Sequence, residues 1–150
     1  MNELLPNVVH VKVDGESGKT SFRSKTSVIA PPPAEPVTQN TFPSGSELLL
    51  LSSTKPHPTL VASTRTLFDR PTDALAFFSV LPSGELELQQ FAYPKGREFR
   101  ATGASKDGRF VVTGGQADGW VSVLGQDKDG LWRPVAEPVQ VEKPTGVLFL

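Results

Sequence analysis

The sequence contains no cysteine. Disulfide bonds and thiolate metal sites are therefore excluded, and a reducing compartment is favoured. Long apolar runs are also missing, since runs such as residues 48–51 are far too short to cross a bilayer. The first residues lack the basic stretch and the apolar segment of a signal peptide. We therefore expect a cytoplasmic protein with no membrane partner.

An excess of charge of one sign is missing as well. The formal net charge is −1, and the lysines and arginines are scattered singly along the chain. Such a chain lacks the basic surface that binds nucleic acid through its phosphates. No nucleic-acid partner is expected.

Metal and phosphate motifs are equally scarce. The two histidines, His10 and His57, are too far apart to form a metal-binding motif, and neither is expected to be catalytic. Residues 127–130 lack the later glutamate of a calcium loop. No helical pattern follows Gly114 and Gly115, as a phosphate-binding glycine loop requires. We expect no metal site and no cofactor.

Turn-forming residues take the place of helical patterns. The chain has 13 glycines and 14 prolines, and few stretches show helical periodicity. Strand-like runs at 109–113, 120–124 and 131–135 alternate with glycine-containing turns. β-branched and aromatic residues favour such strands, and glycine supplies the positive φ of the turns. The pattern predicts an all-β chain of short antiparallel strands, with Trp120 and Trp132 as packing residues.

An internal repeat organises these strands. Three segments consist of an alternating strand, a turn with glycine at Gly18, Gly84 or Gly130, and a second strand. The last two glycines lie 130 − 84 = 46 residues apart, close to the period of about 40–50 residues in a propeller blade. A second motif, a turn followed by a strand, occurs at Gly45 and Gly108. Successive four-stranded propeller blades explain both motifs, and an antiparallel sandwich is the alternative.

Proline interrupts the first half of the repeat. The stretch 30–36 contains four prolines, which cannot donate to a sheet ladder, so it is expected to be an extended surface connection. A linker between two independent domains is the alternative. The roughly 30 residues before it are too few to fold alone without staples.

The later residues resemble a known family. Four segments stand in the order found in lactonase-type seven-bladed β-propellers. They are the turn 106–109, residues 114–116, the turn at Gly130 and residues 144–149. That family includes bacterial 6-phosphogluconolactonases and fungal carboxy-cis,cis-muconate cyclases. Residues 61–65 resemble its "ASNR" segment, with Thr64 in place of the asparagine. Phe99 stands where the family often has proline, and Gly146 where it has cysteine.

The resemblance implies an incomplete propeller. It is good over 61–150 and thin over 1–60, which is expected to hold a divergent blade with the proline-rich insertion. The 150 residues suffice for roughly three blades at about 45 residues each. We expect the C-terminal portion of a seven-bladed propeller, with Met1 inside a middle blade.

The resemblance also implies which residues carry chemistry. Arg65 takes the place of an active-site arginine that faces an anionic substrate, as a guanidinium does well. Arg100 and Arg97 are further substrate-binding candidates, and the alternative for all three is a solvated surface position. The family's catalytic histidine and glutamate belong to blades that this chain is expected to lack.

Two functions are therefore carried forward. The first is a piece of an enzyme that opens or closes the ring of an acidic lactone or carboxylate, inactive or weakly active alone. The second is a non-catalytic β module that self-associates through open blade edges.

Overall fold

The computed structural model describes residues 7–28, 44–52, 56–65 and 71–149. Within these ranges the chain forms strands and turns and no helix. The strands are β1 (Asn7–Val13), β2 (Thr20–Ser27), β3 (Ser44–Leu51), β4 (Thr59–Arg65), β5 (Leu75–Val80), β6 (Leu86–Ala92), β7 (Phe99–Ala104), β8 (Phe110–Gly115), β9 (Trp120–Gln126), β10 (Trp132–Pro134) and β11 (Val139–Gln140). The proline-rich stretch 30–36 lies outside the described residues.

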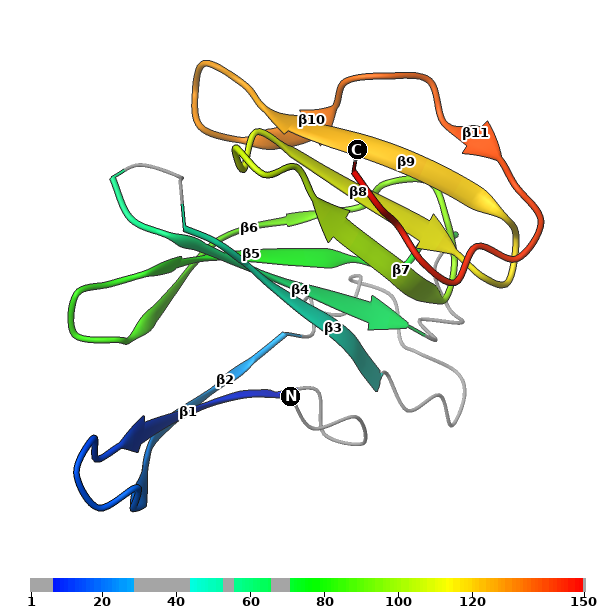
Figure 1. Ribbon diagram of the computed structural model, residues 1–150. Helices are drawn as coiled ribbons and strands as arrows, with labels where there is room; N and C mark the ends of the chain where they lie inside the picture. The colour runs from blue at the N-terminus through cyan, green and yellow to red at the C-terminus, as the bar shows by residue number, and fades with distance from the viewer. Residues whose placement is uncertain (1–6, 29–43, 53–55, 66–70, 150) are drawn as a thin grey trace, which may run out of the picture.

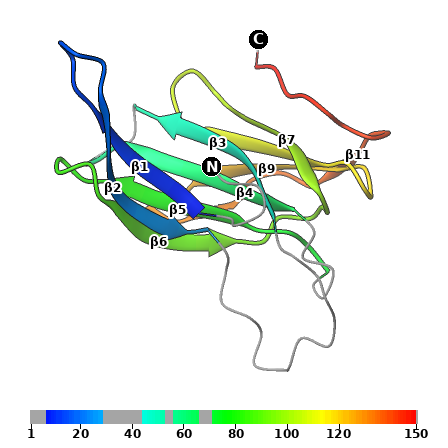
Figure 2. The same ribbon diagram turned by 90° about the horizontal axis from the view of Figure 1, so that it is seen from below.

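The strands form three stacked layers (Figure 1). A first sheet has the order β3-β4-β5-β6, and a second has the order β7-β8-β9-β10, with β11 also paired to β9. The β1-β2 hairpin lies across the far face of the first sheet (Figure 2). All pairs are antiparallel. Each sheet is a meander of consecutive strands, which confirms propeller blades.

The predicted repeat of hairpins is confirmed at the level of hydrogen bonds. The amides of Asp14, Leu81 and Asp127 donate to the carbonyls of Lys19, Glu85 and Leu131 at 2.9, 2.9 and 2.8 Å. The three turns therefore occupy the same place in the hairpins β1-β2, β5-β6 and β9-β10, and the first is one residue longer than the other two. Gly18, Gly84 and Gly130 have φ of 66°, 83° and 80°, where a side chain would add strain.

The second repeated motif was wrong by one strand. Ser44 and Gly45 belong to β3 itself, where they pair with Arg65 and Thr64 before a bulge ahead of Leu48. β3 is the first strand of its blade, whereas β8, after Gly108, is the second strand of the next. The true counterpart of β3 is β7, whose small residues gave no apolar alternation.

The main core lies between the two sheets. Its buried residues are Leu51, Val61, Leu75, Phe77, Ala92, Phe99, Val111, Leu124 and Trp132. The Phe77 and Trp132 rings stack at 5.0 Å with an interplanar angle of 14°, which confirms Trp132 as a packing residue. Trp120 is half-buried and instead lies under the Lys95 ammonium, 3.3 Å from the ring centroid. A second core joins Val8 and Val28 to Ala62, Ala76 and Phe78.

The space between the sheets is wedge-shaped. β3 packs closely on β7, whereas contacts between β6 and β10 are sparse. On the wide side, Gln90 spans the gap: its Nε2 donates to the Trp132 carbonyl at 2.9 Å, and its Oε1 accepts from the Trp132 amide at 2.7 Å. We call the narrow side, formed by β3 and β7, the hub edge.

The last described residues cross the outer face of the second sheet (Figure 1). A Cβ at Gly103 would lie 3.0 Å from Val147 Cγ1, and one at Gly114 would lie 3.0 Å from the Pro144 ring. These two glycines therefore allow the segment to lie directly on β7 and β8.

Aspartates close the turns of the β1-β2, β7-β8 and β9-β10 hairpins. Asp107 Oδ1 accepts from the Ser105 hydroxyl at 2.7 Å and from the Arg109 amide at 3.1 Å. The Arg109 Nε lies 2.5 Å from its Oδ2. These contacts, with the Ser105 hydroxyl first, lower the pKa of Asp107 from 3.8 to about 2.

The lowered pKa of Asp107 predicts a dependence of stability on pH. The ionised carboxylate should stabilise the fold fully above pH 3.8, and this contribution should be lost as the pH falls through about 2. NMR titration of the carboxyl carbon should give a midpoint near 2. Urea unfolding should show Asp107→Asn to be less stable than the parent at pH 6, with a smaller difference at low pH. An Asp107 midpoint near 3.8, or equal losses in Asp107→Asn and the turn control Asp129→Asn, would contradict this.

Candidate functional site

Arg65 is the last residue of β4 and lies beside the hub edge. It pairs with Ser44, the first residue of β3. Its Nε donates to the Ser44 hydroxyl at 3.1 Å, and the side chain is half-buried. The hydroxyl therefore fixes the direction of the guanidinium.

Thr64 holds the backbone next to Arg65. Its hydroxyl donates to the Ala74 carbonyl at 3.1 Å and accepts from the Ala74 amide at 3.0 Å. Its own amide donates to the same carbonyl at 2.9 Å. Thr64 is fully buried. It stands in the place of the family's asparagine, and its hydrogen bonds join the end of β4 to the residue before β5.

Asp73 connects this end of the first sheet to the second. It is 2% exposed, and its amide donates to the Gly96 carbonyl at 3.1 Å. Its Oδ2 accepts from the Glu98 amide. Glu98 has a φ of 57°, an unusual value for a residue with a side chain, and its carbonyl accepts from the Gln116 amide at 3.0 Å.

Arg97 lies in the same connection between β6 and β7. Its amide donates to Asp118 Oδ1 at 3.1 Å, and its carbonyl accepts from the Ala117 amide at 3.2 Å. A Cβ at Gly115 would lie 2.5 Å from the Arg97 nitrogen. The half-buried Arg97 is therefore placed by backbone contacts with the β8-β9 turn.

Arg100 lies on the hub edge itself. It is exposed and is the extra residue of a bulge in β7, since Phe99 pairs with Gly115 and Ala101 with Gly114. A carboxylate from β3 spans the hub edge close by: Glu47 Oε2 accepts from the Thr102 amide at 2.6 Å. That bond occupies an amide that the edge strand β7 would otherwise leave unpaired.

The structure thus brings the three predicted arginines to one end of the blades. Arg65 and Arg100 lie along the hub edge, and Arg97 lies in the connection that leads into β7. Sequence reasoning missed the acids that build this end, Asp73, Asp118 and Glu47. Each binds a backbone amide in another element, and the sequence carries no signal for such tertiary contacts.

The histidines lie at the other end. His57 directly precedes the turn into β4, and His10 lies on β1 near Gly84 in the β5-β6 turn. β4 has 7 residues and spans about 20 Å, so His57 and Arg65 are far apart. Within the described ranges, no group of three histidine, aspartate or glutamate side chains could hold a metal ion. No helix in this part of the chain is long and apolar enough to cross a membrane.

Truncation of the Asp73 side chain should destabilise the fold strongly. Asp73→Ala would leave the Glu98 amide without its acceptor in a buried place and should lower the free energy of unfolding by about 2–3 kcal/mol. Asp73→Asn keeps an acceptor oxygen and should cost less. Urea unfolding measures both, with Asp129→Ala in an exposed turn as the control. Equal stabilities of Asp73→Ala and Asp129→Ala would show that Asp73 does not join the blades.

Comparison with solved structures shows the same fold. A protein from Lactobacillus plantarum superposes with a TM-score of 0.79 at 23% identity, over 99% of this chain and 40% of that one. A putative 6-phosphogluconolactonase from Bacteroides fragilis gives 0.75 at 18% identity, over 97% and 36%. The periplasmic gluconolactonase of Pseudomonas aeruginosa gives 0.73 at 22%, over 95% and 36%. The chain therefore spans about 40% of the length of the first of these.

No protein of curated function matches the sequence. A family model described as lactonase, 7-bladed β-propeller, matches residues 1–149. That match covers nearly the whole chain, including the first 60 residues, where the sequence resemblance was thin. The chain therefore belongs to the lactonase family of seven-bladed β-propellers.

Proposed function

We propose that this chain is a segment of a lactonase-type propeller that supplies Arg65 to a substrate site at the hub. The observation that supports this is the position of Arg65, at the hub-side end of β4 with its guanidinium directed by Ser44. Arg100 and Arg97 reach the same end of the blades. The substrate class is an acidic lactone, which is supported by the name of one similar structure, a putative 6-phosphogluconolactonase.

The reaction proposed for the whole propeller is lactone hydrolysis. The oxygen of water bonds to the carbonyl carbon, the ring C–O bond breaks, and the ring oxygen takes a proton as it leaves. Negative charge develops first on the carbonyl oxygen and remains on the product carboxylate. A fixed guanidinium stabilises both, and it grips a carboxylate with two parallel hydrogen bonds. Ring closure of a carboxymuconate by the same site stays a prediction.

We expect the isolated chain to bind the substrate but to catalyse its hydrolysis weakly or not at all. Proton transfer needs an acid or base within hydrogen-bond reach of the reacting atoms. Both histidines lie at the opposite end of the blades from Arg65, and among the described acids at the Arg65 end, Asp73 and Glu47 already bind backbone amides. The cytoplasmic location expected from the sequence likewise stays a prediction.

Arg65 can be tested with 6-phosphogluconate, the hydrolysis product of the phosphorylated lactone. The probe should shift the amide NMR signals of Thr64, the neighbour of Arg65 in β4, and of Ala74, which is hydrogen-bonded to Thr64. Arg65→Gln should weaken this binding at least tenfold, and Arg65→Lys less, because lysine keeps the charge but not the paired donors. Arg109→Gln in the distant β7-β8 turn is the control.

Two outcomes would contradict the proposal. Unchanged shifts of Thr64 and Ala74 in Arg65→Gln would remove Arg65 from the site. Hydrolysis of 6-phosphogluconolactone by the 150-residue chain well above the spontaneous rate would show that its acid and base are present after all.

Two exposed apolar faces favour the second function, self-association. On the outer side of the β1-β2 hairpin, Val9, Val11 and Phe22 are 44%, 47% and 65% exposed. At the other end of the stack, the second sheet presents the half-buried Val112, Val121 and Val123, with Leu148 82% exposed nearby. These faces occupy the positions at which neighbouring blades pack inside the chain. A second copy could therefore dock head to tail.

Light scattering tests this association. The chain should form oligomers whose mass rises with concentration, and Phe22→Asp should shift the species toward monomer because it places a charge on the hairpin face. Tyr93→Asp is the matched control, since Tyr93 is a 47% exposed aromatic residue in the β6-β7 connection. A monomer at all concentrations, or the same effect from both variants, would exclude head-to-tail docking.

A further inference from the structure

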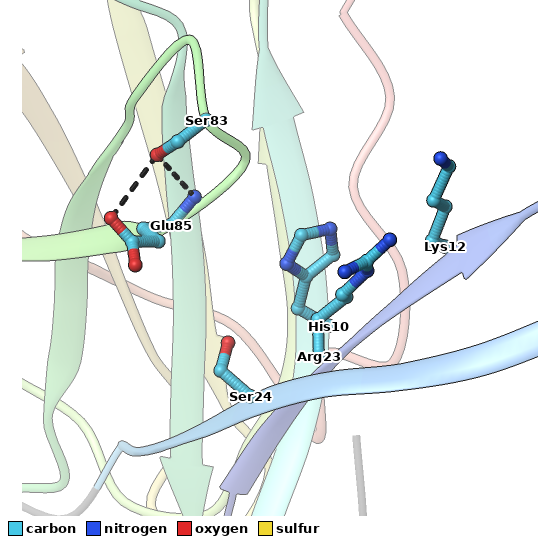
Figure 3. Close-up of a pocket in the computed structure, with 6 residues that line it drawn as sticks. All are labelled: His10, Lys12, Arg23, Ser24, Ser83 and Glu85. Carbon is cyan, nitrogen blue, oxygen red and sulfur yellow. Dashed lines mark hydrogen bonds between the residues drawn. The ribbon is translucent and has the colours of Figure 1, made fainter.

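A cavity of about 570 Å³ lies between the N-terminal hairpin and the first sheet. His10, Lys12, Arg23 and Ser24 line it from β1 and β2, and Ser83 and Glu85 line it from the β5-β6 turn (Figure 3). The volume is within the range of small-molecule sites. It lies at the end of the blades opposite Arg65, so it is separate from the hub site.

The repeat allows the β1-β2 hairpin, which lines this cavity, to be compared with the equivalent β5-β6 hairpin. His10 is four residues before Asp14, and Phe77 is four residues before the equivalent Leu81. His10 pairs with Ser24 and Phe77 pairs with Gln90, and in both hairpins a bulge follows at once. The two positions are therefore the same place in consecutive blades.

Packing fills the wedge in one blade and not in the other. Between the two sheets, Phe77 stacks on Trp132 and Gln90 binds both backbone groups of Trp132. Between hairpin and sheet, the corresponding residues are His10 and Ser24, and a space remains. The two sheets therefore make an aromatic contact at the place where the hairpin and the first sheet leave a hollow with polar walls.

The hairpin wall of this hollow is cationic. Lys12 and Arg23 supply the charge and the imidazole of His10 lies beside them, and within the described ranges none of these three side chains makes a hydrogen bond or ion pair. Arg23 is the extra residue of the bulge, since Phe22 pairs with Val11 and Ser24 with His10. Figure 3 shows the His10 and Arg23 side chains on the hairpin, with Lys12 further along β1.

The opposite wall offers a carboxylate and a hydroxyl. The Ser83 hydroxyl donates to Glu85 Oε2 at 3.2 Å and accepts from the Glu85 amide at 3.3 Å. Gly84 brings this turn against the hairpin, because a Cβ there would lie 2.7 Å from His10 Cε1. A carboxylate repels an oxyanion but accepts hydrogen bonds from hydroxyl groups.

We propose that this cavity binds a small phosphate ester that also carries hydroxyl groups. The phosphate lies against Arg23, Lys12 and His10, whose donors suit its oxygens. The hydroxyl groups lie toward Glu85 and Ser83. The two walls therefore select a ligand with an anionic end and a polyol end rather than a free anion.

Amide NMR of the 150-residue chain tests the site with three probes: glycerol 3-phosphate, inorganic phosphate and glycerol. Glycerol 3-phosphate should give saturable shifts of the Ser24 and Gly84 signals and bind more tightly than inorganic phosphate. Glycerol alone should bind much more weakly than either. Arg65→Gln should leave these shifts unchanged, which separates this site from the hub.

Substitutions on the two walls should have opposite effects on the binding of the phosphate probes. Arg23→Gln and Lys12→Gln should each weaken glycerol 3-phosphate binding about fivefold, the effect of one charge at about 4 Å in water. Lys25→Gln, two residues along β2 and outside the cavity, is the matched control. Glu85→Gln should tighten inorganic phosphate while reducing the preference for glycerol 3-phosphate.

Several results would overturn the proposal. Absence of saturable shifts at Ser24 and Gly84 in the unaltered chain would exclude the site. Equal effects of Arg23→Gln and Lys25→Gln would show only general attraction to surface charge. If Glu85→Gln left the ratio of the affinities for glycerol 3-phosphate and inorganic phosphate unchanged, the placement of the hydroxyl groups toward Glu85 and Ser83 would be wrong.

Discussion

Burial of both faces of each sheet between its neighbours is the constraint on which this structure depends. A four-stranded meander with apolar residues on both faces is not stable alone, and here the first sheet is covered by the hairpin on one side and by the second sheet on the other. The wedge between the sheets requires large residues on its wide side. Phe77, Trp132 and Gln90 fill that side.

The same geometry separates structural from chemical roles among the charged residues. At the Arg65 end, acids bind backbone amides between elements, as Asp73 does for Glu98 and Glu47 does for Thr102. These bonds tie neighbouring strands and connections to one another. The arginines at this end are the groups that we propose to bind an anion. Between hairpin and sheet, the wedge keeps its shape but loses its aromatic filling, and cations line the space.

Local chemistry explains how much the sequence could predict. The hairpins at Gly18, Gly84 and Gly130 were predictable because each turn demands positive φ and each strand alternates. β7 was missed because the residues after Phe99 and Arg100 are small and carry no apolar period, and Gly103 must be small because Val147 packs on it. The Gly45 turn was wrong because a glycine in a strand looks like a turn when its neighbours are unknown. Asp73 and Asp118 could not be found because their partners are brought to them only by the tertiary fold.

The segment lying on β7 and β8 couples distant parts of the chain. Gly103 touches Val147, 44 residues later, and Gly114 touches Pro144, 30 residues later. A methyl group added at either glycine would have to be accommodated by a smaller or shifted residue in that segment. Substitutions at these sites are therefore epistatic: the amino acids tolerated at 103 depend on the one present at 147, although neither residue takes part in the proposed chemistry.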